Sequence, residues 1–237
     1  MDGWVKPDPG TVREFFGDIP VGIDPVDFVA KLDERLDEIL KEMVLQNLTG
    51  NAWDTVEKQV QACYFNAWGE IRSADSFARQ VRRMGPRYPM LKLRVAKQMH
   101  DEMRHYTMYR DCALRMGGKD IMETQPVQEF MAMFDYCDQV SDDVRENVFN
   151  NQFCTEKWAI FLFKTSMEKL ELHPEFKTTL ERILPDEYFH VSNGREAAKM
   201  LAREGEEEQA RMLEIATAMM DYNRRAQAGG GQRIVAF

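Results

Sequence analysis

Two Glu-x-x-His motifs hold the residues of this 237-residue chain that could do chemistry: Glu102 with His105, and Glu187 with His190. Each motif lies in a stretch whose apolar residues recur with a helical period. Positions i and i+3 share one face of a helix, so each glutamate and its histidine can bind one metal ion together. A single motif of this kind in a charged helical protein is more often a solvated face, so the pair needs further support.

Two more glutamates provide that support. Glu70 and Glu156 each lie in the middle of a helical stretch that precedes one of the motifs. Glu70 precedes Glu102 by 32 positions, and Glu156 precedes Glu187 by 31. The four glutamates therefore define two similar helical hairpins.

Helix-breaking residues fall where each hairpin must turn if its glutamates are to lie at one height in antiparallel helices. The first midpoint is at Gly85-Pro86, and the second falls just before His173-Pro174. Each turn is about 15 residues from its ligands, or roughly 23 Å at ~1.5 Å per residue. Four glutamates and two histidines can then converge inside a four-helix bundle.

The neighbours of the two motifs are apolar at helical spacing. They are Val95, Met99, Tyr109, Leu180, Leu184, Val191 and Gly194. The motifs are therefore predicted to lie on core faces, where carboxylates are costly unless they are paired or bound to metal. Asp101 and Asp186, each four positions before a histidine, are then candidates to orient the histidine rings. The alternative is that both are ordinary surface acids.

This constellation resembles the ferritin-like di-iron carboxylate proteins, in which two helices give one glutamate each and two others give a Glu-x-x-His motif. The resemblance covers roughly residues 51–205. It implies an all-α, ferritin-like four-helix bundle with accessory N- and C-terminal helices. It also implies a metal pair bridged by Glu102 and Glu187, with no catalytic residue beyond the ligands. The implied ligands are Glu70, Glu102, His105, Glu156, Glu187 and His190.

Carboxylate and imidazole ligands suit iron or manganese, and so few ligands per metal leave positions open for dioxygen or peroxide. We expect two Fe ions, with Mn or a mixed Mn/Fe pair as the alternative. The resemblance implies a di-iron oxygenase or oxidase acting on an organic substrate, closest in character to phenylacetyl-coenzyme A epoxidase catalytic subunits. The alternative is a ferroxidase or a metal-handling protein that removes peroxide, as rubrerythrins and manganese catalases do. A structural bundle without catalysis is the third interpretation, against which the intact ligand set speaks.

The elements that must position these residues follow from the apolar periodicity. We expect an irregular arm over residues 1–24, a single helical domain over 25–226 and a flexible tail over 227–237. Within the domain, the predicted helices span approximately 25–47, 52–84, 90–116, 127–137, 142–171, 174–202 and 205–225. The helix over 174–202 contains Pro185, which predicts either a kink or a break.

Three inward-facing residues near the ligands are candidates for a substrate pocket. Gln152 and Ile160 lie one turn on either side of Glu156, and Tyr109 lies one turn after His105. A pocket of this kind would take a small organic molecule.

Composition restricts the class of protein. Hydrophobic residues make up 44% of the chain and charged residues 30%, as in soluble globular proteins. The sequence lacks an apolar run of ~18 residues and a signal-peptide pattern, so we expect a cytoplasmic protein without membrane contact. The four cysteines form no C-x-x-C pair and are expected to be free thiols. The sequence therefore lacks the Cys-rich iron module of rubrerythrins, and we expect a separate electron donor.

Charge is uneven around the first hairpin turn. The segment from Arg79 to Lys97 contains seven basic residues and no acidic residue, so it carries a charge of +7. The remainder of the chain carries −16, which gives the net charge of −9. The segment is either a solvated turn or a surface for an acidic electron donor or a phosphate-bearing substrate such as a coenzyme A thioester or tRNA. The acidic remainder argues against general nucleic-acid binding. Separately, we expect the protein to form a homo-oligomer.

Overall fold

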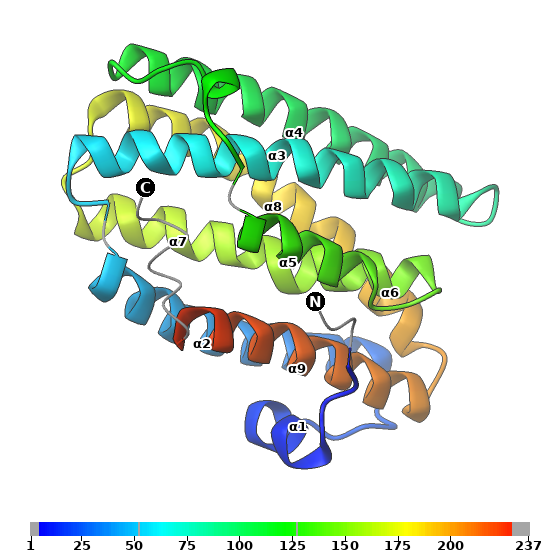
Figure 1. Cartoon of the computed structure of the whole chain (residues 1–237). Coiled ribbons are helices and arrows are strands. Elements are labelled where there is room, and N and C mark those ends of the chain that lie inside the picture. Colours follow the sequence, from blue (N-terminus) through cyan, green and yellow to red (C-terminus); the bar gives the residue numbers. More distant parts are fainter. Residues whose placement is uncertain (1–4, 52, 127, 229–237) are drawn as a thin grey trace.

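The computed structural model describes residues 5–51, 53–126 and 128–228, and every regular element in these ranges is a helix (Figure 1). The predicted all-α bundle is confirmed. None of the described helices is both long enough and apolar enough to cross a membrane. The elements in chain order are α1 (Pro9–Phe16), α2 (Pro25–Asn51), α3 (Val56–Met84), α4 (Pro89–Arg115), η1 (Ile121–Glu123), α5 (Gln128–Asp138), α6 (Val144–Val148), the π-helix η2 (Phe149–Thr155), α7 (Glu156–Lys169), α8 (Pro174–Ala202) and α9 (Glu206–Ala228).

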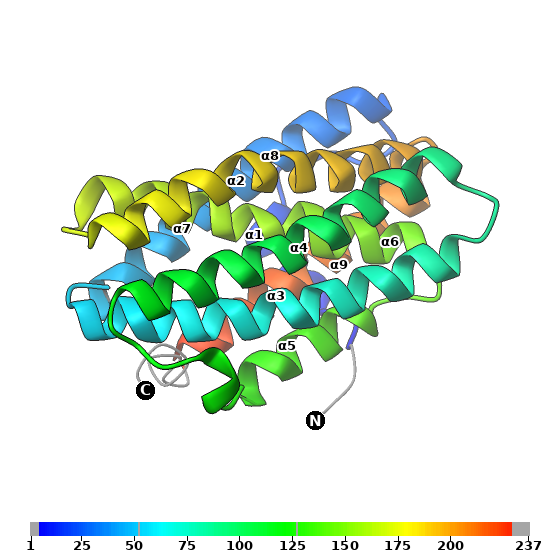
Figure 2. The same ribbon diagram turned by 90° about the horizontal axis from the view of Figure 1, so that it is seen from above.

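Two antiparallel hairpins form the centre of the bundle (Figures 1 and 2). Helices α3 and α4 are joined at Gly85, whose φ of 55° favours glycine, and α7 and α8 are joined at His173. The ring Nδ1 of His173 accepts a hydrogen bond from the backbone N–H of Glu175 and so caps α8. Both turns lie where the spacing of the glutamates predicts them. Helix α4 packs along α8, which brings the two hairpins together.

The third ligand-bearing segment differs from the prediction of one α-helix over 142–171. It consists of α6, then the seven-residue π-helix η2, then α7, which begins at Glu156. The backbone of η2 lies against α8 at Gly194, where a Cβ atom would come within 2.3 Å of the backbone nitrogen of Phe153. Only glycine permits this approach, and the wide turn of a π-helix places an additional residue in the segment.

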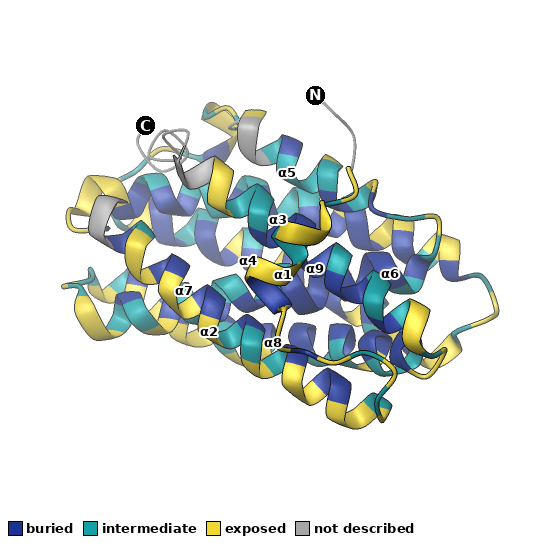
Figure 3. Ribbon diagram, turned by 90° about the horizontal axis from the view of Figure 1, so that it is seen from below, coloured by how far each residue is buried: buried dark blue, intermediate teal, exposed yellow. Residues whose placement is uncertain are grey.

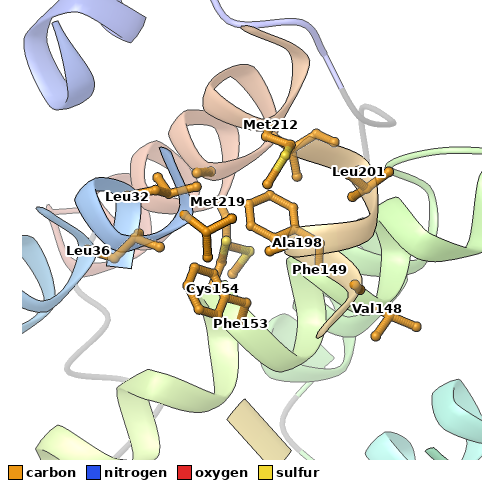
Figure 4. Close-up of a cluster of buried hydrophobic side chains, with 14 of the residues drawn as sticks. Leu32, Leu36, Val148, Phe149, Phe153, Cys154, Ala198, Leu201, Met212 and Met219 are labelled. Atoms are coloured by element: carbon orange, nitrogen blue, oxygen red, sulfur yellow. The ribbon is translucent and has the colours of Figure 1, made fainter. Parts of the chain in front are cut away.

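The apolar face of η2 packs in a buried cluster with α2, α8 and α9 (Figure 4). Phe149, Phe153 and Cys154 are all completely buried there. The labelled partners of these three residues are Leu32, Leu36, Val148, Ala198, Leu201, Met212 and Met219. The accessory helices therefore cover the side of η2 that faces away from the ligands.

Helix α8 continues through Pro185 to Ala202 without a break. The possibility that the proline ends the helix is therefore excluded. Proline has no N–H to donate and so removes one bond of the helix ladder, but the packing of α8 against α4, α7 and η2 maintains the helix on both sides.

The irregular N-terminal arm predicted over residues 1–24 is wrong in part, because it contains α1. Asp8 caps this helix by accepting hydrogen bonds from the backbone N–H groups of Gly10 and Thr11. Phe15 and Phe16 are buried where α1 packs on α9 and α2. Of the predicted flexible tail, residues 229–237 lie outside the described residues, and the two before them belong to α9.

Buried and exposed residues alternate around the long helices with the helical period, and the buried faces point inward (Figure 3). The core comprises the cluster around η2 and a second cluster that includes Cys63, Tyr109 and Cys112 between the two hairpins. All four cysteines are buried free thiols, as expected.

Candidate metal centre

The six predicted ligands converge between the two hairpins. Glu70 comes from α3, Glu102 and His105 from α4, Glu156 from the first position of α7, and Glu187 and His190 from α8. Five of them form two overlapping sets, in each of which the potential ligand atoms all lie within 4.8 Å of one another. One set contains Glu70, Glu102 and His105, and the other contains Glu102, Glu156 and His190. Glu102 belongs to both sets.

The two histidine rings direct their Nδ1 atoms at the same two carboxylates. The Nδ1 atom of His105 lies 3.3 Å from Glu102 Oε2 and 3.5 Å from Glu187 Oε1. The Nδ1 atom of His190 lies 3.2 Å from Glu102 Oε1 and 3.3 Å from Glu187 Oε2. The two motif glutamates therefore lie between the histidines, each with one oxygen toward each ring, which is the arrangement that bridging carboxylates require. Glu70 lies at the side of His105, 3.9 Å from its Nδ1 atom.

The outer ring nitrogens face aspartates on the opposite helix. The Nε2 atom of His105 lies 3.2 Å from Asp186 Oδ2, and that of His190 lies 3.5 Å from Asp101 Oδ2. The expectation that each aspartate serves the histidine four positions later on its own helix is wrong. Because α4 and α8 pack side by side, each aspartate reaches across the interface to the other ring.

The two aspartates have different surroundings. The side chain of Asp101 is 6% exposed and pairs with Lys97, whereas that of Asp186 is 19% exposed and pairs with Arg104. Burial alone would raise the pKa of Asp101, but the nearby His190 ring and the hydrogen bond and charge of Lys97 outweigh it and hold this pKa well below its ordinary value. Asp101 is therefore a charged partner for the His190 ring.

Protonation of the buried carboxylates is divided among them by their neighbours. Burial, followed by repulsion from Glu102, raises the pKa values of Glu70 and Glu156 well above the ordinary value. Burial also opposes ionisation of Glu102, but the charges of His190 and His105 lower its pKa to about 2. For His190, burial opposes protonation and the carboxylates Glu102 and Glu187 outweigh it, so its pKa is raised well above its ordinary value. The protein thus balances its buried negative charge with protons, which bound cations would displace.

The donor set fits a pair of iron or manganese ions. Carboxylate oxygens and imidazole nitrogens are ligands for these metals. Within the described part of the chain, Nδ1 of His105 and of His190 is buried without a hydrogen-bond partner, although carboxylate oxygens lie within 3.5 Å of each. Buried polar atoms that remain unpaired in this way are rare in proteins and require an explanation. A metal ion between nitrogen and carboxylate would satisfy both.

Gln98 is a residue of the site that the sequence interpretation missed. Its Nε2 atom donates hydrogen bonds to Glu102 Oε1 at 3.2 Å and to Glu156 Oε1 at 3.1 Å. Its Oε1 atom accepts a hydrogen bond from Asn193 Nδ2 at 3.0 Å. The signal was its position one turn before Glu102, on the same helix face. Gln98 fixes two carboxylates of the centre with one amide group.

The three candidate pocket residues are packed in the core. Gln152 donates a hydrogen bond to Gln80, and Ile160 belongs to the apolar cluster around η2. Tyr109 is completely buried, and its hydroxyl has no hydrogen-bond partner among the described residues. Burial and then the nearby charges of Glu70 and Glu187 raise the pKa of Tyr109 well above its ordinary value.

Two clefts of the described protein lie elsewhere. One, with a volume of about 800 Å³, lies between α3 and the segment 116–128, and its lining includes Tyr64, Phe65 and Trp68. The other, of about 390 Å³, lies at the first hairpin turn between Arg83, Arg87 and Arg145. The candidate pocket residues line neither cleft.

Part of the basic segment 79–97 is engaged within the protein. Arg79 forms an ion pair with Asp138, and Arg94 donates a hydrogen bond to Ser192 Oγ at 2.5 Å. Arg83 donates hydrogen bonds to the Asn147 side chain and the Ser141 carbonyl. These residues hold the first hairpin to its neighbours, so a docking role would fall to the remaining basic residues.

A solved structure shares this arrangement of helices. The chain resembles a TenA homologue from Pseudomonas syringae pv. tomato with a TM-score of 0.60, over 94% of this chain and 96% of that one. The two sequences are 14% identical, so the likeness concerns the fold alone. No protein-family model matches the chain, and no curated protein matches it significantly. The likeness to ferritin-like di-iron proteins therefore remains a prediction that rests on the ligand set.

Proposed function

We propose that this protein is a non-haem di-iron oxidoreductase, an oxygenase or oxidase that uses a carboxylate-bridged metal pair to oxidise an organic substrate with dioxygen. One observation carries the proposal: the carboxylates of Glu102 and Glu187 each lie between the Nδ1 atoms of His105 and His190, at 3.2 to 3.5 Å. Carboxylates so buried are costly without metal or charged partners. Bound ferrous ions would supply the electrons that reduce dioxygen.

The residues of the chain have separate tasks in this proposal. Glu70 with His105 would hold one ion, and Glu156 with His190 the other. Asp186 and Asp101 orient the two rings from the outside and fix which nitrogen faces the metals. Gln98 holds the carboxylates of Glu102 and Glu156 in place. The surrounding core excludes bulk water.

The side chain of Glu70 is 14% exposed, more than those of Glu102 and Glu187 at 2% and 4%. Glu156 on α7 is also partly exposed, so access for dioxygen is expected on the α3 and α7 sides of the centre. We further propose that a separate donor supplies electrons, and that the exposed arginines of the first hairpin turn dock either this donor or the phosphates of a coenzyme A thioester.

A ferroxidase or peroxide-removing protein is the second candidate, and one observation favours it. The residues predicted to line a substrate pocket are packed in the core, and the two clefts described above are lined by other residues. A centre of this kind suits a small oxidant, which needs no large cavity.

Metal analysis of variants tests the proposal. Wild-type protein from iron-supplemented cells is expected to hold about two ions per chain, and Glu102→Ala and Glu187→Ala are each expected to hold fewer. Glu168→Ala, which changes an exposed glutamate of α7, is the matched control. Unchanged metal content in both centre variants would reject the ligand assignment.

Oxygen and peroxide consumption then separate the two candidates. Substrate-dependent oxygen uptake by the reduced, iron-loaded protein supports the oxygenase. Rapid turnover of peroxide or ferrous iron without any organic substrate supports the second candidate.

A further inference from the structure

A layer of buried amides lies next to the metal centre, on the side of the first hairpin turn. The layer has four members, one on each of α3, α4, η2 and α8. Each of these amide side chains belongs to a residue that is at most 2% exposed. They are Gln80, Gln98, Gln152 and Asn193. Three of them lie three or four positions from a ligand, or about 5–6 Å along the helix axis. The layer is therefore continuous with the centre.

Hydrogen bonds join these amides in pairs. Gln98 bonds to two carboxylates of the centre and accepts from Asn193, as described above. Gln152 Nε2 donates to Gln80 Oε1 at 2.8 Å. The backbones that carry Asn193 and Gln152 adjoin where α8 contacts η2, since a Cβ atom on Gly194 would come within 2.7 Å of the carbonyl carbon of Gln152.

Each pair leaves atoms unused. Within the described part of the chain, Asn193 Oδ1, Gln152 Oε1 and Gln80 Nε2 are buried without a hydrogen-bond partner. The same holds for Asn151 Oδ1 beside Gln152. The oxygens of Asn193, Gln152 and Asn151 are acceptors, and Gln80 Nε2 is a donor. A water molecule can donate a hydrogen bond to such an oxygen and accept one from such a nitrogen. Buried polar atoms of this kind are normally satisfied by ordered water.

The polar layer continues to the surface along α3. Asn151 Nδ2 donates a hydrogen bond to Ser76 Oγ at 3.2 Å, and Ser76 donates to Asp138 on α5. Ser76 lies one turn from Gln80 on the same helix, and both are buried. The side chain of Asp138 is 18% exposed. Polar groups on neighbouring segments thus extend from the buried carboxylates towards solvent, in three hydrogen-bonded groups.

Two other buried glutamines of the chain, Gln59 and Gln209, are bonded to the backbone. Gln59 accepts a hydrogen bond from the N–H of His173 at 2.8 Å and donates to the carbonyl of Trp53 at 2.9 Å. Gln209 makes equivalent bonds to Gly22 and Ile23. The unused atoms of the amide layer are therefore not shared by every buried amide of the protein. Asn150, two positions before Gln152, does share them, because both of its side-chain atoms are buried without a partner among the described residues.

We propose that Gln80, Gln98, Gln152 and Asn193 form a binding site for a file of ordered water molecules that connects the metal-binding carboxylates to Asp138 at the surface. The amides hold the waters by neutral donors and acceptors, so the file occupies the site without adding charge beside the centre. It gives the buried carboxylates a hydrogen-bonded connection to solvent on the side of the first hairpin turn. The water site follows from the amides themselves and stands independently of the proposed function.

The experiment counts long-lived buried waters by ¹⁷O magnetic relaxation dispersion of the full-length metal-free protein. The variant Gln80→Leu/Gln152→Leu removes one hydrogen-bonded pair and its unused atoms together. It is expected to lose about two long-lived waters relative to wild type. Gln59→Leu, which changes a fully bonded buried amide, is the matched control and is expected to keep the wild-type count.

Thermal unfolding provides a second readout. Removing both members of a buried polar pair is nearly neutral, whereas removing one partner of a satisfied set leaves others unpaired. The melting temperature of Gln80→Leu/Gln152→Leu is therefore expected to lie within a few degrees of wild type, and that of Gln59→Leu lower by more than about 4 °C. An unchanged water count in a folded double variant overturns the proposal. If the double variant does not fold, an unchanged water count in the single variant Gln152→Leu overturns the proposal.

Metal content distinguishes this proposal from the proposed function. Neither Gln80 nor Gln152 belongs to the ligand set, so the double variant is expected to bind as much iron as wild type. If the wild-type protein binds no iron but holds more long-lived waters than the double variant, the di-iron function is rejected and the water site is supported.

Discussion

Replacing Asp101 by asparagine tests the cross-helix pairing at the centre. The substitution preserves the shape of the side chain and removes the charge that faces Nε2 of His190 at 3.5 Å. Substitutions of residues that orient a metal ligand typically lower metal affinity 10- to 100-fold, which corresponds to about 1.4–2.7 kcal/mol. We expect Asp101→Asn to fall in the upper part of this range.

Asp186→Asn is expected to have the smaller effect. The side chain of Asp186 is 19% exposed and also paired with Arg104, whereas that of Asp101 is 6% exposed. Solvent screens the more exposed charge more strongly, so its loss costs less. The predicted order of metal affinity is wild type, then Asp186→Asn, then Asp101→Asn.

The assay has two parts. Competition with a fluorescent chelator gives the affinity for ferrous or manganous ions, with the exposed Asp75→Asn on α3 as the control. ¹⁵N NMR of the histidine rings in the metal-free protein identifies which ring loses its partner. Asp101→Asn should shift the Nε2 resonance of His190 and leave that of His105 near its wild-type position.

Two results would refute the reasoning. Wild-type metal affinity in Asp101→Asn would show that Asp101 does not support a ligand. A shift confined to His105 would show that each aspartate serves its own helix and that the pairing across α4 and α8 does not form in solution.

Three further predictions follow from the same geometry. Gly194→Ala is expected to destabilise the protein by about 1–3 kcal/mol in urea unfolding, because the added Cβ would meet the η2 backbone at 2.3 Å. Raised pKa values of Glu70 and Glu156 mean that the folded metal-free protein binds more protons than the unfolded chain above the ordinary value of 4.5. Its free energy of unfolding should therefore fall as pH rises from about 5 to 8, and metal should reduce that slope. Arg82→Glu/Arg87→Glu should weaken donor- or substrate-coupled oxygen consumption most at low salt.

Controls accompany each of these predictions. Gly85→Ala, at a positive φ but with no atom within 4 Å of the added Cβ, separates backbone strain from the steric clash at Gly194. A stability that rises over the stated pH range would contradict the assignment of neutral buried glutamates. In the double arginine variant Arg83 is kept, because it bonds to Asn147 and Ser141 and its loss would disturb packing. Coupled rates equal to wild type at low salt would identify the turn as merely solvated.

The local sequence was enough to predict the bundle and the convergence of the six candidate ligands. A glutamate and histidine three positions apart must share a helix face. The nearly equal spacing of the glutamates, 32 and 31 positions, with Gly85 and Pro174 at the turns, sets the height at which the two hairpins place them. These are properties of single helices and short turns, which depend little on what packs against them.

Tertiary packing decided what the sequence left open. Which histidine each aspartate contacts depends on how α4 lies against α8, and this contact has no periodic signal in either helix. The π-helix before Glu156 depends on Gly194, a residue about 40 positions away that allows the two backbones to approach. The amide layer depends on four segments meeting. Helical spacing alone could place Gln98 and Gln152 near a ligand, but the hydrogen bonds of Gln98 to Asn193 and of Gln152 to Gln80 appear only when the helices lie side by side.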